Sequence, residues 1–428
     1  MADAKWRDPY AGNILTQGLG PILSREQATA RMMFLPTFPG DISGVPKHIR
    51  IHYLVQLRDL HIPSLEGGRL VETVDLIVRP SYRYRDPRAP QTWSVISNEP
   101  LAHKTPRAPA GAAVAVGHSG TGKTEAILRA FNCYPQQVIL HEDFPHMARG
   151  LAQMVWLSAD VPASGGAVDL ARSLMRAWDA AMAAYLPNVP SRFFNTLEKA
   201  IRDKDRMLDE WRQVAASHFL GILHLDEVQN FFKLQTLEKR RSRKNPEGGL
   251  ELSIVEDQCL KWILTLTNTW QIGLLLSGTP DGVGALTKRL SNVQRFVTSG
   301  FHRFPHFESA DDPFFASVVF PQLLRYQLVK HPLPNTPGLA NLIIELSGGI
   351  LRIIVALWVA AHRIAFERNA DDLRVEDFRR AAATYLAPVG PAVTALRSRD
   401  PKLMSRYEDM IVRDDGYWST FWNSMVST

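Results

Sequence analysis

The sequence has little that could support a disulfide framework or a structural metal centre. Only two cysteines, Cys133 and Cys259, occur in 428 residues, and they lie far apart without the spacing of a zinc site. We expect both to be small buried hydrophobic residues. No apolar run reaches the length of a bilayer-spanning helix, and no apolar segment follows the charged first residues as in a secretory signal. We therefore expect a cytoplasmic protein with no membrane partner.

The composition is that of a globular protein. Hydrophobic residues make up 45% of the chain and charged residues 21%, which excludes a disordered tail. The length exceeds what one hydrophobic core usually fills, so we expect two or three structural units. The net charge of +6 and the pI near 9.3 favour a polyanionic partner, although charge alone is weak evidence for nucleic acid.

The order of apolar segments predicts an α/β core followed by a helical domain. Continuous apolar runs, typical of strands buried on both faces of a parallel sheet, occur at residues 112–116, 154–158, 221–225 and 273–277. A helical pattern at 168–178 lies between two of them, and such alternation indicates an α/β sheet. From about Asp312 the periodicity is helical, at 314–329, 339–346, 350–367 and 375–386. We predict an amino-terminal extension (1–105), an α/β core (106–310), a small all-α lid (311–390) and a carboxy-terminal tail (391–428), the extension and the tail contacting partners.

The amino-terminal extension carries no readable catalytic motif. Helical spacing occurs at 48–57 and at 70–78. The stretch from Arg79 to Arg88 then alternates arginines with aromatic rings, which suits stacking on nucleic acid or docking of a partner. A solvated loop is an equally good interpretation of this stretch.

Residues 117–124 match the G-x-x-x-x-G-K-[ST] pattern at every fixed position, between an apolar strand and a helical segment. Glycines let backbone amides turn toward phosphates, and the helix amino-terminus adds a partial positive charge. In such a loop Lys123 reaches the β and γ oxygens of ATP, and the Thr124 hydroxyl ligates Mg²⁺. The sequence thus predicts ATP and Mg²⁺ as cofactors, with nucleotide contacts from Gly117, His118, Ser119, Gly120, Thr121, Gly122, Lys123, Thr124 and Glu125.

A second motif, which is acidic, supplies the carboxylates that a magnesium-bound triphosphate needs. The apolar run at 221–225 ends in Asp226 and Glu227, which resembles a Walker B motif. We predict that Asp226 holds the magnesium and that Glu227 activates the attacking water as general base. The second acid favours an ATPase over a protein that only binds nucleotide.

Further positions resemble elements of the AAA+ superfamily. Ser277 or Thr279, at the end of the next strand, occupies the place of a sensor-1 group. In the helical domain Arg352 stands in a Gly-Gly-x-x-Arg setting that matches the sensor-2 pattern. Arg295, or alternatively Arg289, lies where these ATPases present an arginine finger to the nucleotide of a neighbouring subunit.

Residues 100 to 385 together resemble the TnsC and TniB type of AAA+ transposition regulators, found in Tn-seven-like and CRISPR-associated transposons. The strings that carry the resemblance begin at Pro162 (P-A-S-G-G-A-V-D-L), Asp226 (D-E-V-Q-N), Ser277 (S-G-T-P), Leu333 (L-P-N-T-P-G-L-A), Leu346 (L-S-G-G-I-L-R) and Ala360 (A-A-H-R-I-A). The chain departs from this pattern in its first hundred residues and in an insertion at 233–250.

The resemblance implies an ATP-dependent homo-oligomer, a hexamer-like or heptamer-like ring or a helical filament on double-stranded DNA, in the bacterial cytoplasm. It also implies partners, namely a transposase and a target-selection protein of the TniQ or TnsD type, with ATP hydrolysis driving disassembly. The insertion contains a basic cluster that could neutralise DNA phosphates without reading bases. Its members are Lys239, Arg240, Arg241, Arg243 and Lys244.

Two other functions stay open at this point. One is a different DNA-acting AAA+ ATPase, of the replication-initiator or helicase-loader type, which shares the same core and lid. The other is a signalling or scaffold NTPase that uses nucleotide as a conformational switch and never contacts DNA.

Overall fold

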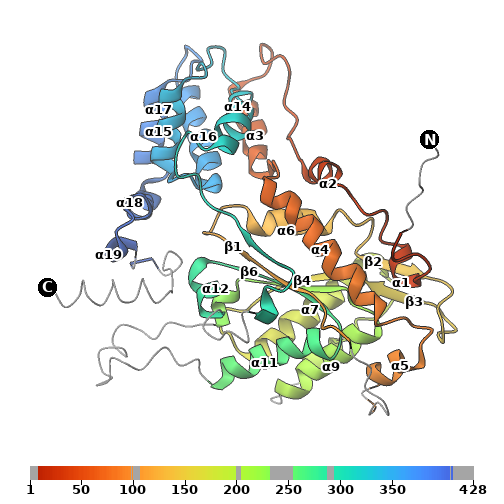
Figure 1. Cartoon of the computed structure of the whole chain (residues 1–428). Helices are drawn as coiled ribbons and strands as arrows, with labels where there is room; N and C mark the ends of the chain where they lie inside the picture. The colour runs from red at the N-terminus through yellow and green to blue at the C-terminus, as the bar shows by residue number, and fades with distance from the viewer. Residues whose placement is uncertain are drawn as a thin grey trace, which may run out of the picture.

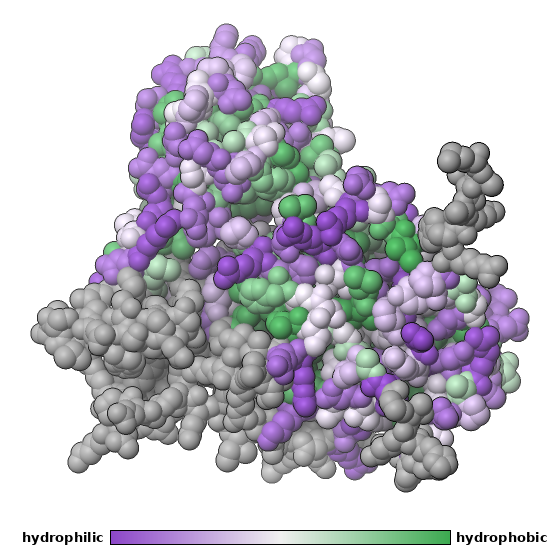
Figure 2. Space-filling view, viewed as in Figure 1, coloured by the Kyte–Doolittle hydropathy of each residue, from purple (hydrophilic) through white to green (hydrophobic). Residues whose placement is uncertain are grey.

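The computed structural model describes residues 8–97, 99, 107–198, 204–231, 254–286, 294–404 and 406–407. Two large hydrophobic clusters organise this part of the chain, one around a central sheet and one mainly within the carboxy-terminal helices, and a small third one contains Ile350 and Leu396. The helical lobe stands above the sheet in Figure 1, and Figure 2 shows that polar and apolar side chains are intermixed on this face.

The central sheet is parallel and has the strand order β4-β5-β6-β1-β7. Its strands are β1 (Ala112–Val116), β4 (Trp156–Asp160), β5 (Ile222–Asp226), β6 (Gly273–Gly278) and β7 (Gly300–Arg303). A separate antiparallel pair is formed by β2 (Val138–His141) and β3 (Leu151–Met154). The predicted α/β class with a parallel sheet is confirmed.

Burial explains which strands the sequence could predict. Every residue of β1, β5 and β6 is buried, as expected for central strands covered on both faces. The edge strand β7 has only His302 buried, so its Gly-Phe-His-Arg sequence carries no continuous apolar run. The apolar pattern therefore gives no signal for this strand.

Helices cover the sheet on both faces (Figure 1). The core contains α6 (Lys123–Phe131), α7 (Ala167–Tyr185), α8 (Phe194–Glu198), α9 (Lys204–Ser217), η2 (Val228–Phe231), α11 (Ile254–Asn268) and α12 (Pro280–Leu286). Helix α7 extends the predicted 168–178 segment in both directions. It buries Leu170, Leu174 and Trp178, which recur at helical spacing and face the core.

The lid consists of short helices around Trp358, which is fully buried. They are η3 (Phe315–Val319), α14 (Phe320–Leu324), α15 (Pro337–Ser347), α16 (Leu351–Phe366), α17 (Val375–Ala383), η4 (Ala387–Val389), α18 (Gly390–Ser398) and α19 (Pro401–Met404). The predicted helical region is confirmed, but the expected helix over 314–329 was too long, because it ends at Leu324 and the chain then turns. Among the described residues no single helix is long and apolar enough to cross a bilayer, and α15 with α16 passes that test only as a pair bent by 113°.

The amino-terminal residues contribute to both hydrophobic clusters. They form α1 (Ile14–Gln17), α2 (Arg25–Met32), α3 (Lys47–Val55), η1 (Gln56–Asp59), α4 (Leu65–Arg83) and α5 (Pro90–Ile96). Leu54 and Leu57 belong to the lid cluster, whereas Leu70 and Ile77 of α4 belong to the sheet cluster. The amino-terminal region therefore packs on the core and on the lid at once.

The stretch from Arg79 to Arg88 is only in part a solvated loop, because Arg83 and Arg88 are exposed whereas Arg79 and Arg85 are buried. It begins inside α4, and Arg79 and Arg85 are 2% and 6% exposed. Arg79 pairs with Asp75 at 2.7 Å, while Arg85 donates to the Leu220 carbonyl at 2.7 Å. Two of the guanidinium groups predicted to stack on nucleic acid are thus used inside the protein.

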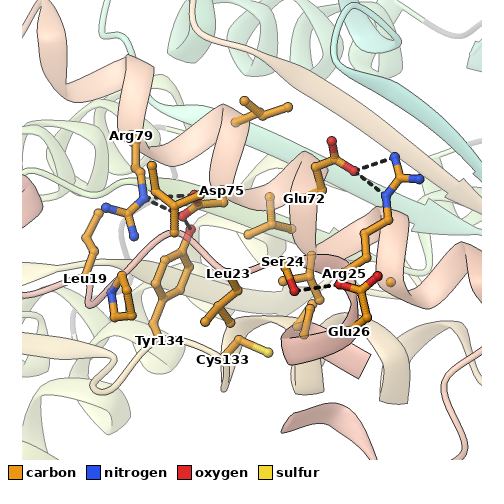
Figure 3. Close-up of a pocket in the computed structure, with 18 residues that line it drawn as sticks. Leu19, Leu23, Ser24, Arg25, Glu26, Glu72, Asp75, Arg79, Cys133 and Tyr134 are labelled. Atoms are coloured by element: carbon orange, nitrogen blue, oxygen red, sulfur yellow. Dashed lines mark hydrogen bonds and ion pairs between the residues drawn. The ribbon is translucent and has the colours of Figure 1, made fainter. Parts of the chain in front are cut away.

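Figure 3 shows Arg79 beside a hollow of about 400 Å³ between α2, α4 and α6. The Tyr134 hydroxyl donates to the same Asp75 carboxylate at 3.1 Å. Burial raises the pKa of Tyr134 well above its usual value, and the negative Asp75 acts in the same direction. The Arg79, Asp75 and Tyr134 side chains therefore satisfy one another and join α4 to the end of α6.

A buried ion pair joins α3 to the lid. Arg50 donates to both carboxylate oxygens of Asp371, at 3.1 and 2.7 Å, and to the Leu328 carbonyl at 2.8 Å. Both side chains are 4% exposed, and the guanidinium also lies over the Phe366 ring. Loss of one partner would leave the other charge buried and unpaired.

We expect Arg50→Ala to lower the free energy of unfolding by about 3–5 kcal/mol, because it strands the Asp371 carboxylate. Chemical denaturation monitored by tryptophan fluorescence measures the change. The matched control is Arg25→Ala, which removes an exposed pair with Glu72 and should cost about 0–1 kcal/mol. Equal effects of the two variants would contradict the assignment.

Candidate functional site

Three glycines give the loop between β1 and α6 its shape. Gly120 and Gly122 have φ of 83° and 91°, a left-handed conformation that glycine adopts without steric cost. A Cβ on Gly117 would lie 2.3 Å from the Phe304 carbonyl oxygen, so no larger residue fits there. The fixed glycines of the motif are therefore required by backbone geometry.

Lys123 is the first residue of α6 and is 8% exposed. Its Nζ donates to the carbonyls of Gly117 at 2.7 Å and His118 at 3.1 Å. The ammonium group thus lies inside the loop, at the positive end of a helix, where phosphate oxygens can replace the carbonyls. Glu125 instead accepts from Arg129 on the outer side of α6.

The loop side chains are held by local contacts. The Thr121 hydroxyl donates to the His118 carbonyl at 2.9 Å, and the His118 ring lies 5.3 Å from that of His306, measured between centroids. The loop is therefore ordered by its own hydrogen bonds and by the segment that follows β7.

Asp226 and Thr124 are brought together as the sequence predicts. The Thr124 hydroxyl donates to Asp226 Oδ2 at 2.6 Å, across 102 residues of sequence. Burial pushes the pKa of Asp226 upward, but His224 and the hydrogen bonds from Ser277, Thr124 and the Glu227 amide outweigh it and lower the pKa below its usual value. The group is an ionised carboxylate near neutral pH.

Glu227 adopts a left-handed backbone, with φ of 57°, which is uncommon for a residue with a Cβ. Its carboxylate accepts a hydrogen bond from the side-chain amide nitrogen of Gln229. The side-chain oxygen Oε1 of Gln229 in turn accepts from the Thr279 backbone amide at 3.2 Å. Partial burial and the neighbouring Asp226 raise the pKa of Glu227. Glu227 is therefore a better proton acceptor than an ordinary glutamate.

The two sensor-1 candidates have different partners. Ser277 is fully buried and donates to Asp226 Oδ1 at 2.5 Å. The Thr279 hydroxyl donates instead to Asp281, in the first turn of α12. Of the two, only Ser277 contacts the predicted magnesium-binding carboxylate.

Arg352 lies on the loop as expected of a lid residue. Its backbone amide donates to the Gly120 carbonyl at 3.1 Å, and a Cβ on Gly120 would lie 3.0 Å from the Arg352 Cβ. Gly349, with φ of 68°, is needed nearby because a Cβ there would lie 1.8 Å from the Phe307 carbonyl oxygen. The Gly-Gly-x-x-Arg string thus seats the lid directly on the phosphate-binding loop.

The predicted arginine finger and DNA contacts are only partly described. Arg295 is exposed in a helical turn whose next residue, Phe296, is buried at 1% exposure. Arg289 lies outside the described residues, as does the whole basic cluster of Lys239, Arg240, Arg241, Arg243 and Lys244. Of the two arginine-finger candidates, Arg295 is therefore the one that the structure describes, and it lies on the surface.

A cavity of about 330 Å³ adjoins the loop and was not predicted from the sequence. Residues 60–67, the start of α6, residues 303–307 and the lid around Leu351 line it. His61 in this lining is 7% exposed, and its Nε2 has no hydrogen-bond partner within the described ranges. Burial, and then the positive Arg129, lower the pKa of His61 to about 4, so the ring is neutral.

The site as a whole fits a nucleotide with magnesium. Oxygen donors at Thr124 and Asp226 suit a small hard cation, and Lys123 with the loop amides suits phosphates. The cavity beside them has the apolar character and a buried polar atom that a base requires. Residues 60–67 do not stand out in the sequence, because only the fold brings them to the loop. Gln229 belongs to the D-E-V-Q-N string, but its contact with Glu227 was not predicted.

One family model and several solved structures resemble parts of this chain. Residues 107–286 match the family model described as an AAA domain, and no curated protein sequence matches the chain. Among solved structures, the Walker-type ATPase PABY2304 of Pyrococcus abyssi is 14% identical with a TM-score of 0.37, over 68% of this chain and 72% of that one. The Orc1 protein of Aeropyrum pernix, solved in complex with DNA, is 15% identical with a TM-score of 0.44, over 80% and 69%.

The family match covers the loop, both acidic residues and β6, which are the parts that build the site. It does not reach the lid or the amino-terminal helices. The region from 107 to 286 is therefore an AAA domain of the P-loop ATPase type.

Proposed function

We propose that this chain is an ATP-hydrolysing regulator of DNA transposition that assembles on double-stranded DNA. The observation that carries the hydrolytic part is the pair of carboxylates at the end of β5, one held against Thr124 and the other positioned by Gln229. A protein that only binds nucleotide needs the first carboxylate and not the second.

The chain's own groups account for binding. Loop amides and the Lys123 ammonium neutralise the phosphates, and the cavity beside residues 60–67 takes the base and ribose. Thr124 and Asp226 would hold magnesium, which supplies positive charge to the β and γ oxygens when it is bound. Arg352 brings a further positive charge from the lid.

Glu227 is the general base in this proposal. Its raised pKa favours accepting a proton from water as the water attacks the γ-phosphate. Gln229 contacts the Glu227 carboxylate and is itself fixed, because a Cβ on Gly282 would lie 2.5 Å from the Gln229 Cα and Cβ. The base is thereby held near the end of β6.

The role in transposition rests on the sequence strings that resemble the TnsC and TniB type, and their packing supports it. A Cβ on Gly165, in the first string, would lie 2.4 Å from the Asn230 carbonyl oxygen of the second. The Asn230 side-chain amide in turn donates to the Val161 backbone carbonyl at 2.8 Å. The second and third strings meet through Gln229 and Thr279. Short strings that interlock in this way behave as one unit around the nucleotide.

The proposed assembly is a homo-oligomeric ring or filament on duplex DNA that links a target-selection protein of the TniQ or TnsD type to a transposase. The exposed Arg295 supports contact between subunits. The basic net charge supports contact with DNA. Electron microscopy with and without duplex DNA, in a slowly hydrolysed ATP analogue, tests it. DNA-dependent rings or filaments are expected, and their absence would favour a nucleotide switch that never contacts DNA.

Lys123→Ala should abolish measurable ATP binding. It removes a charged donor to the phosphates, and hydrogen bonds to charged groups contribute about 1.5–3 kcal/mol each. Isothermal titration with ATP and magnesium measures the loss. Lys330→Ala, an exposed lysine of the lid, is the control, and an unchanged affinity for Lys123→Ala would refute the loop assignment.

Glu227→Gln should bind ATP normally and lose turnover by about 10²–10⁴-fold, since magnesium binding by Asp226 survives while the water loses its base. Phosphate release and nucleotide binding are measured on the same preparation. DNA complexes of this variant should persist after ATP is removed. Turnover at the wild-type rate would exclude the assigned role.

Arg295→Ala should be inactive alone and regain turnover when it is mixed with Lys123→Ala. A finger acts on the neighbour's nucleotide, so a mixed interface can contain one intact finger and one intact loop. Steady-state phosphate release over a range of mixing ratios measures this. No rescue at any ratio indicates action within one subunit, or Arg289 in place of Arg295.

Neutralising Lys239, Arg240, Arg241, Arg243 and Lys244 should weaken DNA binding about equally for all sequences. Each lost phosphate contact should reduce the slope of log K against log salt by about 0.9. Fluorescence anisotropy at several salt concentrations gives the slope, and ATP binding should stay normal. Neutralising Arg25 and Arg69, which are exposed on α2 and α4, is the control. An unchanged slope places the DNA contacts elsewhere.

A further inference from the structure

A continuous chain of hydrogen bonds crosses three neighbouring strands and ends on Asp226. The Ser158 hydroxyl of β4 lies 2.8 Å from His224 Nδ1 of β5, and His224 Nε2 lies 2.7 Å from the Ser277 hydroxyl of β6. Ser277 then contacts Asp226 Oδ1 at 2.5 Å. Ser158 and His224 are direct partners in the register of β4 and β5, so sheet pairing itself fixes the first link.

Chemistry assigns a direction to this chain. An ionised carboxylate only accepts hydrogen bonds, so the Ser277 hydroxyl donates to Asp226. The Ser277 oxygen is then free to accept from a proton on His224 Nε2. With the imidazole neutral, Nδ1 accepts from the Ser158 hydroxyl. Each of these three hydrogen bonds therefore has its donor on the side away from Asp226 and its acceptor on the side toward it.

The two oxygens of Asp226 consequently have separate roles. Oδ1 accepts from Ser277 and from the Glu227 backbone amide at 2.9 Å, whereas Oδ2 faces Thr124. Two donors from the strand ends hold one oxygen inside the sheet. The carboxylate cannot rotate without breaking both bonds, so Oδ2 stays directed at the phosphate-binding loop.

A purely structural residue at position 224 would be apolar. The other residues of β5 up to Asp226 are Ile222, Leu223 and Leu225, all fully buried, and the Phe131 ring packs against His224 from α6 at 5.9 Å. Burying an imidazole in such a place costs free energy unless both ring nitrogens find partners. Here both do, and one of those partners leads to the metal-binding carboxylate.

We propose that His224 is a positioning residue that, through Ser277, orients Asp226 toward the nucleotide-bound cation. This inference rests on the proposed function, because it assigns His224 a role toward the same magnesium site. Ser277 then acts by holding Asp226, whether or not it also contacts a phosphate. Outer partners of metal ligands typically change metal affinity by about 10–100-fold when they are removed.

The test measures binding of a fluorescent ATP analogue as magnesium is titrated, with a magnesium-free series in excess EDTA. His224→Leu should raise the half-saturating magnesium concentration by about 10-fold or more and leave the EDTA series unchanged. His224→Gln, which can still place an N–H donor at Ser277, should restore most of the magnesium response. His362→Leu is the control, because His362 is a fully buried lid histidine that bonds to the Trp358 carbonyl.

Two outcomes separate this inference from the proposed function. If the wild-type chain shows no magnesium-dependent nucleotide binding, the proposed function fails. If the wild type responds to magnesium, and His224→Leu and Ser158→Ala have the same half-saturating magnesium concentration as the wild type, the positioning role of His224 is overturned. Ser158→Ala removes only the hydrogen bond to His224, the one farthest from Asp226, and keeps the proposal testable if His224→Leu does not fold. It should shift the magnesium response in the same direction, by a smaller factor.

Discussion

The position of Asp226 is the constraint on which the nucleotide site depends. Its side chain contacts Thr124 of α6 and Ser277 of β6, and its backbone carbonyl accepts from the amide of Val161, just after β4. A single residue thus joins the phosphate-binding helix to the ends of three parallel strands. Ligand sites of open α/β sheets lie at these carboxyl ends because polar groups from separate segments converge there. Displacement of β5 by one residue would dismantle the site without changing any motif.

The amino-terminal helices extend this organisation beyond the AAA domain. Arg85 donates to the Leu220 carbonyl immediately before β5, and Arg50 pairs with Asp371 in the lid. These arginines are buried because each finds carbonyl or carboxylate partners that offset the loss of water. Basic residues that suggest a surface for nucleic acid are here part of the internal packing.

Sequence reasoning succeeded where local chemistry is demanding. The loop at 117–124 requires glycines at fixed places, and continuous apolar strands such as β1 have few alternative structures. The burial of Arg79 and Arg85 was not predicted, because α4 continues through Pro80 to Arg83 and carries Arg79 into the interior. The bond that proline omits would go to the carbonyl of Leu76, which lies on the exposed side of the helix at 57% exposure.

Other features could not be predicted because they exist only after folding. The cavity beside His61 joins residues from the amino-terminal helices, the core and the lid. The choice between Ser277 and Thr279 depended on whether each hydroxyl faces Asp226 or Asp281. Neither distinction leaves a signal in spacing or composition. Alternation along a strand would place residues 277 and 279 on one face, but β6 ends at Gly278 and Thr279 lies beyond it.

The division of the amino-terminal helices between the two hydrophobic clusters also limits how the lid can move. The chain passes between the clusters at three separate places, from Met32 to Leu54, from Leu60 to Leu70 and from Phe304 to Ala310. A body attached by one connection can swing in any direction, whereas a body attached at three places has few degrees of freedom left and can only rock through small angles. Since Arg352 lies on Gly120, such rocking opens or closes the space directly over the phosphates. Under the proposed function, the lid would then move in step with the occupancy of the phosphate-binding loop.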